Sequence, residues 1–213
     1  MNMTVGQALN LPDGSVIRLS VQQDLAPTYE VFCNCVERKV LDIALDMERN
    51  KKNLLSLGED PRTTIIGIAL KAAGFDAEHD TNRNGHVDLL VKNGRYEWMA
   101  EAKNDNGPAY IMEGFRQLVD RYADGNPNSS SGALLIYTDK ANKSTLLDNW
   151  IKHVSDYYEY PISNAEKCME TLTSRTTHVS EATGLNYRVR HIPISFYYKP
   201  TDKSARNSKE HKG

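Results

Sequence analysis

The chain has 213 residues and a formal net charge of −2, with 25% charged and 8% aromatic residues. This length and composition suit one folded domain with elaborations. They exclude a protein whose whole surface is basic for binding nucleic acid, so any basic surface must be local. The three cysteines show no paired C-x-x-C spacing, which favours a reducing compartment and free thiols.

The sequence predicts neither a membrane span nor a secretory signal. No apolar run approaches the ~20 residues needed to cross a bilayer. The N-terminal segment MNMTVGQALNLPDG lacks the basic start and the apolar core of a signal peptide. We therefore expect a cytoplasmic protein with one domain over residues 1–202. Residues 203–213 are polar and predict a disordered tail.

The N-terminal part predicts short extended segments and then one long helix. Pro12-Asp13-Gly14 is typical of a turn, and residues 15–21 are typical of a strand. Residues 28–56 carry apolar side chains at helical spacing, namely Tyr29, Phe32, Val36, Val40, Ile43 and Met47. The polar residues 50–53 and then Gly58 mark the end of this helix.

A second helix is predicted between residues 60 and 74. Asp60 suits the N-cap, Pro61 suits the first helical position, and Gly74 suits the left-handed position after the last turn. Residues 75–80 predict a short strand, and residues 81–85 predict a polar turn.

Residues 86–103, HVDLLVKNGRYEWMAEAK, predict a β-hairpin. Asn93-Gly94 is a strong two-residue turn signal because both residues tolerate a positive φ. Such a turn places Lys92 opposite Arg95 and separates two faces. The apolar face holds Val87, Leu89, Val91, Tyr96, Trp98 and Ala100. The other face holds His86, Asp88, Leu90, Glu97, Met99, Glu101 and Lys103.

After the hairpin the pattern alternates between helices and strands. Residues 110–123 predict a helix, residues 125–132 a flexible loop, and residues 133–138 a buried central strand. Residues 143–158 predict another helix, and residues 163–174 can also be helical. Residues 187–198 alternate loosely around Pro193 and predict an edge strand.

The polar face of the hairpin predicts a metal site. In the expected register Asp88 lies diagonal to Glu101, at roughly 7–8 Å, so the two carboxylates could share one divalent cation. The Ala102 carbonyl could add a backbone oxygen. Lys103 could orient a water or neutralise developing charge, and His86 falls opposite Glu101. The alternative is an ordinary solvated hairpin face, but Trp98, Ala100 and Ala102 bury the strand.

Asp88 followed by Glu101-Ala102-Lys103 at the end of an apolar strand resembles the PD-(D/E)xK nuclease superfamily. Val87 stands where the proline of that name would be. The resemblance covers about residues 59–138 and implies a restriction-endonuclease-like αβββαβ core, with a mixed central sheet flanked by helices. Residues 1–58 and 139–202 would then be N-terminal and C-terminal elaborations. Periodicity alone predicts only a mixed α/β class.

The resemblance also implies further site residues. Superfamily members often bring an acidic residue from the preceding helix to the metal, and Glu59 or Asp60 could serve, although capping explains Asp60 and a helix N-terminus favours Glu59. Gln117 and Tyr122 resemble the Q-x3-Y element of the RecB-like branch, but the spacing here is Q-x4-Y. Asn104, Asn106 and His86 are accessory candidates. A local basic surface could come from Arg116, Arg121, Lys140 and Lys143.

The resemblance, together with these residues, implies an enzyme that hydrolyses phosphodiester bonds with Mg2+ or Mn2+. It further implies DNA cleaved internally as the substrate, a prokaryotic defence or restriction setting, and a homodimer or a partner protein as a source of affinity. The alternative is a catalytically inactive protein of the same fold that binds nucleic acid or a protein partner.

Overall fold

A computed structural model describes residues 3–12, 15, 17–18, 21, 25–26, 28–82, 85–122, 126–157, 162, 164–180 and 183–201. The helices are α1 (Val5–Leu9), α3 (Tyr29–Arg49), α4 (Lys51–Leu54), α5 (Glu59–Ala72), α6 (Pro108–Arg116), the π-helix η1 (Gln117–Tyr122) and α7 (Lys143–Ser155). The strands are β1 (Asp76–Asn82), β2 (His86–Asn93), β3 (Tyr96–Asn104), β4 (Ser131–Thr138), β5 (Asn164–Cys168), β6 (Thr173–Val179) and β7 (Asn186–Ser195).

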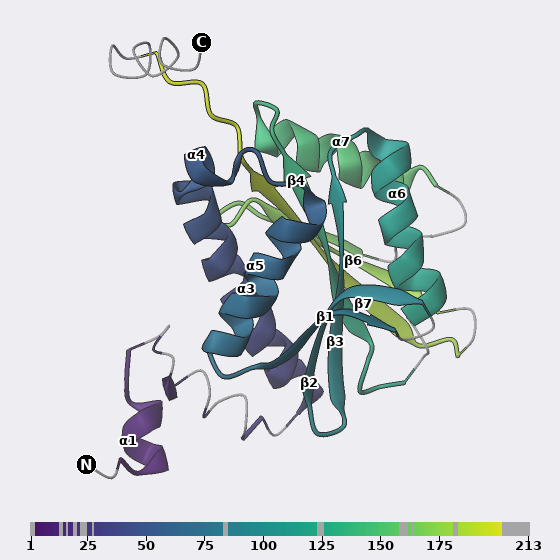
Figure 1. The fold of residues 1–213 in the computed structure, drawn as a ribbon. Helices are drawn as coiled ribbons and strands as arrows, with labels where there is room; N and C mark the ends of the chain where they lie inside the picture. Colours follow the sequence, from purple (N-terminus) through teal and green to yellow (C-terminus); the bar gives the residue numbers. More distant parts are fainter. Residues whose placement is uncertain are drawn as a thin grey trace.

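The strands of the described residues form one seven-stranded mixed sheet in the order β1-β2-β3-β4-β7-β6-β5 (Figure 1). β1, β2 and β3 are antiparallel neighbours, whereas β3, β4 and β7 run parallel. β6 and β5 complete the sheet in antiparallel pairing. Each of the eight residues of β4 is buried, as expected for a central parallel strand. The fold is therefore α/β, and residues 59–138 follow the order α5-β1-β2-β3-α6-η1-β4.

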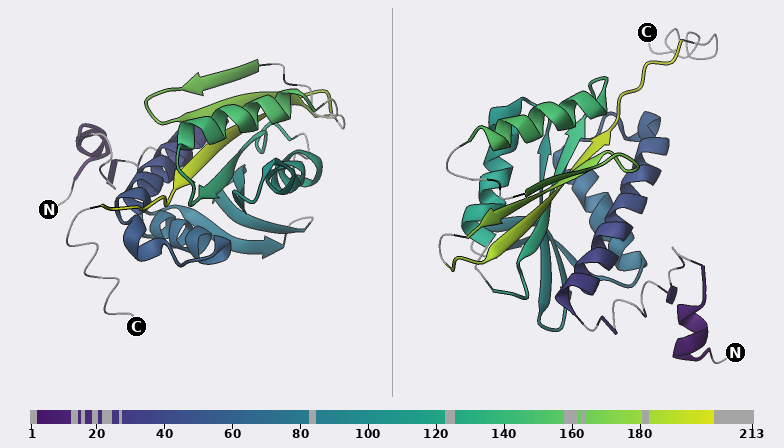
Figure 2. Two further views of the ribbon diagram at one scale, coloured as in Figure 1. Left: turned by 90° about the horizontal axis from the view of Figure 1, so that it is seen from above. Right: turned by 180° about the vertical axis from the view of Figure 1, so that it is seen from behind.

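Helices cover both faces of the sheet, and two views of the molecule show these layers (Figure 2). α3 and α5 lie on one face, where Phe32, Ile66 and Trp98 belong to one apolar core. α6 and α7 lie on the other face, where Phe115, Leu134 and Trp150 belong to a second core. Alternating side chains of β2 and β3 feed the two cores, as the period of a strand requires.

The hairpin between β2 and β3 forms, but its turn lies one residue later than the sequence predicted. Asn93 pairs with Tyr96, so Gly94 and Arg95 make the two-residue loop. Gly94 has a φ of 58°, and glycine is favoured at the first position of a type II′ turn. Lys92 therefore lies opposite Glu97, not Arg95. Because the register moves by two residues, Leu89, Val91 and Trp98 keep their predicted face, whereas Val87 belongs to the core under α6 and α7, so its predicted face is wrong.

Two helix predictions need correction at their ends. α5 begins at Glu59 with Gly58 as its N-cap, so Asp60 lies in the first turn and is not the cap. Gly74 has the expected positive φ, at 89°. The long helix predicted over residues 28–56 is present as α3 and the short α4, which meet at Asn50.

The C-terminal third differs most from expectation. Residues 163–174 were predicted to be helical, yet β5 and the start of β6 occupy them, because pairing with a neighbouring strand outweighs local helix propensity. β7 is not an edge strand, since it lies between β4 and β6. Its pairing with β6 ends at His191, so Pro193 has one neighbouring strand and its missing N–H is tolerated.

Some predictions concern segments that the structure describes only in part or not at all. Ile17, Arg18 and Val21 are helical, which contradicts a strand over residues 15–21. Residues 13–14 of the predicted turn and residues 203–213 of the predicted tail lie outside the described residues. Within the described part of the chain, no helix combines the length and apolar character needed to cross a membrane.

Candidate metal and catalytic site

Asp88 and Glu101 lie beside one another where the pairing of β2 with β3 has ended. The pairing of β2 with β3 ends at Leu89 and Ala100, and these two acids are the next residues on either strand. The neighbouring Leu90 and Met99 belong to the core under α6. The register shift therefore brings Asp88 across from Glu101, closer than the predicted diagonal placement.

Glu101 is a buried carboxyl group that has the Asp88 N–H and the Lys103 ammonium nearby but no hydrogen bond of normal length in the part of the chain that the structure describes. Its exposed fraction is 1%, and neither Oε1 nor Oε2 has a hydrogen-bond partner within the described residues. Burial and the neighbouring Asp88 carboxylate raise the pKa of Glu101 to about 8, although Lys103 opposes this shift. A buried carboxylate without hydrogen bonds is costly unless a cation offsets its charge. The group is thus suited to a positively charged ligand.

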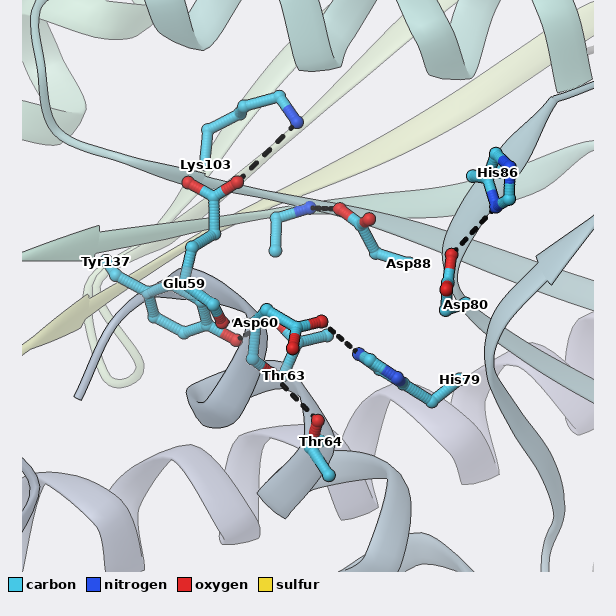
Figure 3. A network of polar contacts seen from close by, with 11 residues as sticks. Glu59, Asp60, Thr63, Thr64, His79, Asp80, His86, Asp88, Lys103 and Tyr137 are labelled. Atoms are coloured by element: carbon cyan, nitrogen blue, oxygen red, sulfur yellow. Dashed lines mark hydrogen bonds and ion pairs between the residues drawn. The ribbon is translucent and has the colours of Figure 1, made fainter.

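The Lys103 ammonium lies between two glutamates from different elements. Its Nζ is 3.6 Å from Oε2 of Glu101 and 3.8 Å from Oε1 of Glu59. Figure 3 shows Glu59 and Lys103 pointing toward one another, with Asp88 beside them. Only 12% of the Lys103 side chain is exposed. These distances exceed a direct hydrogen bond, so the ammonium can still bind another group.

Glu59 joins this site through the backbone of β3. Its Oε2 accepts a hydrogen bond of 2.5 Å from the Asn104 N–H. Burial raises the pKa of Glu59 and Asp88 adds to this effect, whereas the Asn104 N–H and Lys103 lower the pKa. The structure thus brings Glu59, and not Asp60, to the predicted acidic position. Asn104 contributes through its backbone N–H.

Two buried residues that the sequence did not indicate fix the start of α5. Arg62 donates hydrogen bonds to the Leu55 carbonyl and to Asp139, and it lies over the Phe196 ring at 4.0 Å. Thr63 hydrogen-bonds to the Tyr137 hydroxyl at 2.9 Å. These contacts hold the first turn of α5, and hence Glu59, against β4.

Asp88 also binds the backbone of β3. Its Oδ2 accepts a 2.8 Å hydrogen bond from the Ala102 N–H (Figure 3). This bond fixes the carboxylate where the strand pairing has ended. The predicted backbone ligand, the Ala102 carbonyl, belongs to the same residue, which is fully buried in β3.

Gly114 of α6 makes room for the Lys103 side chain. A Cβ atom at this position would lie 2.6 Å from Cγ and 2.9 Å from Cε of Lys103. Such distances are far inside van der Waals contact. A glycine within a predicted helix is a sequence signal of close packing, and this one was missed.

Gln117 lies in a hollow next to Lys103. The hollow encloses about 470 Å³ and is lined by Lys103, Tyr110, Glu113, Arg116, Gln117, Asp120 and Arg121. The buried Oε1 of Gln117 has no hydrogen-bond partner among the described residues. Gln117 begins the π-helix η1, a structure that is frequent at functional sites.

His86 does not face Glu101 as predicted. His86 lies on β2 and pairs with Asn82 of the neighbouring strand β1. Its Nδ1 lies 2.9 Å from Oδ1 of Asp80 (Figure 3). The shifted hairpin register is the reason. Asp80 was not indicated by the sequence, and its φ of 52° is unusual for a residue other than glycine.

The four predicted basic residues divide into two groups. Arg116 and Arg121 line the hollow beside Lys103. Lys140 lies 3.1 Å from Asp105 beyond the end of β4, and Lys143 is 2.7 Å from Glu48 of α3. Lys143 therefore serves a contact between helices, and a local basic surface from these residues stays a prediction. Asn106 lies in the exposed loop after β3.

The oxygen atoms near Asp88 suit a hard divalent cation that takes only a few of its ligands from the protein. Among the described residues, no three His, Cys, Asp or Glu side chains converge as a ready metal cage. Mg2+ is commonly held by only one or two carboxylates with water and substrate phosphate. Asp88, the buried Glu101 and the Ala102 carbonyl fit that pattern.

No protein-family profile, no curated protein and no solved structure matches this chain. The residues and their arrangement are thus the basis for a functional assignment.

Proposed function

We propose that this protein is a metal-dependent nuclease with a restriction-endonuclease-like core, and that it hydrolyses phosphodiester bonds in DNA. The observation that carries the proposal is the Glu101 carboxyl group, buried beside the Asp88 carboxylate and the Lys103 ammonium with no hydrogen bond of normal length at either oxygen among the described residues. The order α5-β1-β2-β3-α6-η1-β4 supports the fold assignment, because it is the αβββαβ order that the resemblance implies.

The metal would be Mg2+ or Mn2+. Asp88, Glu101 and the Ala102 carbonyl would hold it, with Glu59 as an additional ligand or a partner of its water. When bound, the ion would polarise the phosphoryl oxygen and make a coordinated water more acidic. Asp88 is positioned for this role by its bond to the Ala102 N–H, and Glu59 by its bond to the Asn104 N–H.

Lys103 would serve the reacting phosphate group. Its ammonium is held near Glu101 and Glu59 at 3.6 and 3.8 Å, so it can orient the attacking water or stabilise developing negative charge. His86 and its partner Asp80 lie at the margin, where we assign them no chemical step.

Gln117 would contact the substrate or a metal-bound water. The motif containing Gln117 and Tyr122 has one residue more than the Q-x3-Y element it resembles. A π-helix closes its hydrogen bonds across one residue more than an α-helix does, and η1 spans residues 117–122. The backbone can therefore accommodate the additional residue without separating positions 117 and 122 along the helix.

The test is a cleavage assay with the full chain. Supercoiled plasmid, linear duplex, single-stranded DNA and RNA are incubated with Mg2+, with Mn2+ and with chelator. We expect cleavage of DNA that needs the divalent ion. Lys103→Ala should reduce the rate at least about 100-fold, the lower range of losses from removing an acid–base or charge-stabilising group.

Lys92→Ala is the matched control, because Lys92 lies on β2 four residues from Asp88, toward the hairpin turn, and its ammonium pairs with Glu78 of β1. It should cleave at the wild-type rate. Intact substrates under every condition, or undiminished cleavage by Lys103→Ala, would contradict the proposal. Binding of nucleic acid without any cleavage would favour the inactive binding protein instead.

A further inference from the structure

A second hollow, which we call the α6–α7 hollow, opens where the parallel strands β3 and β4 end. It encloses about 430 Å³. Its apolar wall includes Pro108, Ile111, Leu146 and Trp150, and its polar wall includes Asn149 and His153. Pockets of this size with apolar walls and a few polar groups are typical of small-ligand sites, and the carboxyl ends of parallel strands often bind ligands.

The α7 side of this hollow presents polar groups in a line. Thr145, Asn149 and His153 are four residues apart, so they follow one another along one face of the helix. Asn149 is exposed, and its side chain makes no hydrogen bond to any residue that the structure describes. The neighbouring His153 ring stacks on Trp150 with centroids 6.0 Å apart. A flat ligand with apolar faces and a polar edge would meet both kinds of surface.

A positively charged side chain, Lys140, also lines this hollow. The Lys140 ammonium is held by the Asp105 carbonyl at 2.7 Å and its carboxylate at 3.1 Å, yet 65% of the Lys140 side chain is exposed. Asp105 follows Lys103 by two positions, which is roughly 7 Å along an extended chain. The N-terminus of α6, capped by Gly107 without a side-chain bond, lies at this edge.

We propose that the α6–α7 hollow binds an unpaired nucleobase of the strand whose phosphate lies at Lys103. This inference rests on the proposed nuclease function and specifies its substrate. The base would lie against Pro108 and Leu146, with its edge at Asn149 and its phosphate near Lys140. A base in a duplex is stacked and paired, so the hollow would favour single-stranded or flipped nucleotides.

The first test uses nucleotides and the full chain in chelator, where no hydrolysis occurs. Trp150 is only 2% exposed but borders the hollow and stacks on His153 there, whereas the other tryptophan, Trp98, belongs to the core on the opposite face of the sheet, so fluorescence changes report on Trp150. Deoxynucleoside 5′-monophosphates should quench the emission, whereas deoxyribose 5-phosphate and inorganic phosphate should not. Equal responses to the phosphates without a base would overturn the inference.

The second test compares fluorescence anisotropy of labelled single-stranded DNA and blunt duplex, again in chelator. Wild-type protein should bind the single strand more tightly, and Asn149→Ala should weaken that binding about tenfold, within the range for loss of one base contact. Ser155→Ala is the control, because Ser155 lies on α7 with its hydroxyl bonded to the Ile151 carbonyl. Unchanged binding by Asn149→Ala would contradict the inference.

The two proposals can fail separately. Nucleotide-dependent quenching with no cleavage under any condition would keep the base site and remove the nuclease. Loss of cleavage in Lys103→Ala, together with wild-type single-strand binding by Asn149→Ala, would keep the nuclease and remove the base site.

Discussion

At the scale of single residues, the chemistry of the site depends on a carboxyl group that is unfavourable for the fold. Glu101 has a pKa of about 8 against an ordinary value near 4.5, mainly because it is buried. Between these two pH values the unfolded chain has lost the proton that the native chain retains. The resulting loss of stability is absent below about pH 4.5 and complete above about pH 8.

Glu101→Gln should therefore stabilise the metal-free protein at pH 8.5. We expect the melting temperature to rise by at least about 3 °C, the shift that ~1 kcal/mol gives in a chain of this size. The gain should shrink toward pH 4.5, where the wild-type group is protonated. Glu97→Gln, on the same face of β3, serves as the control and should change little. A Glu101→Gln protein that melts below wild type at pH 8.5 would refute this account of the buried carboxylate.

At the scale of elements, the close approach of α6 to β3 positions the Lys103 side chain. Gly114→Ala places a methyl group 2.6 Å from Cγ of Lys103 and 3.3 Å from Cδ1 of Leu134, so the lysine must move. We expect cleavage to fall at least tenfold while the protein stays folded, because about 1 Å of displacement at a reacting group is costly.

Gly67→Ala is the matched control for this change. Gly67 is also a buried glycine in a helix, but a Cβ there meets His79 and Leu89 at 3.7 Å, an ordinary contact. It should retain activity and gain stability from the better helix propensity of alanine. Equal activity of the two glycine variants, measured as initial rates on the same DNA, would show that Gly114 does not position Lys103.

The helices and strands also show how much of the fold the sequence could predict. Strong periodicity predicted α3, α5, the hairpin and β4. The alternation of β2 and β3 predicted which side chains share a face, except for Val87. The register was wrong because Asn93-Gly94 and Gly94-Arg95 both provide a two-residue turn, and only pairing with β1 and β3 decides between them. Likewise, β5 carries helix-forming residues, and its strand conformation depends on contact with β6.

The placement of the candidate site residues was predictable in part, also from strand alternation. Asp88, Glu101 and Lys103 follow from strand alternation, and the structure brings Glu59 to Lys103. The position of His86 was wrong because it depended on the register. Arg62, Thr63 and Asp80 have no sequence signal, since their roles arise from contacts between segments distant in the chain or from an unusual backbone angle.

At the scale of the whole molecule, a chain of buried polar groups joins α7 to the C-terminal strands. The Trp150 indole N–H donates to Nδ1 of His191 at 3.0 Å, and Thr176 lies within 2.8 Å of the opposite ring nitrogen. Thr176 also bonds His178 at 2.7 Å. Burial, and secondarily His178, lower the pKa of His191 to about 3. Acid should therefore weaken this half of the fold.

The unfolded chain binds a proton at His191 below about pH 6.5, whereas the native chain does so only near pH 3. Stability should consequently fall as the pH drops below 6.5, by at most about 1.4 kcal/mol per pH unit. The measurement is denaturant unfolding from pH 7 to pH 4.5 in a Glu101→Gln background, which removes the opposing effect of Glu101. Adding His191→Gln should flatten the profile. A profile as steep as before would show that another group causes the acid sensitivity.

The central claim, a divalent cation site at Asp88 and Glu101 with Lys103 beside it, is tested most directly by calorimetric titration with Mn2+. Wild-type protein should bind the ion at millimolar concentration or below, and Glu101→Gln should lose that binding because a ligand charge is gone. Lys103→Ala should bind as well as wild type or more tightly, since a neighbouring positive charge is removed. A wild-type protein that takes up no Mn2+, or a Glu101→Gln variant that binds it like wild type, would contradict the assignment.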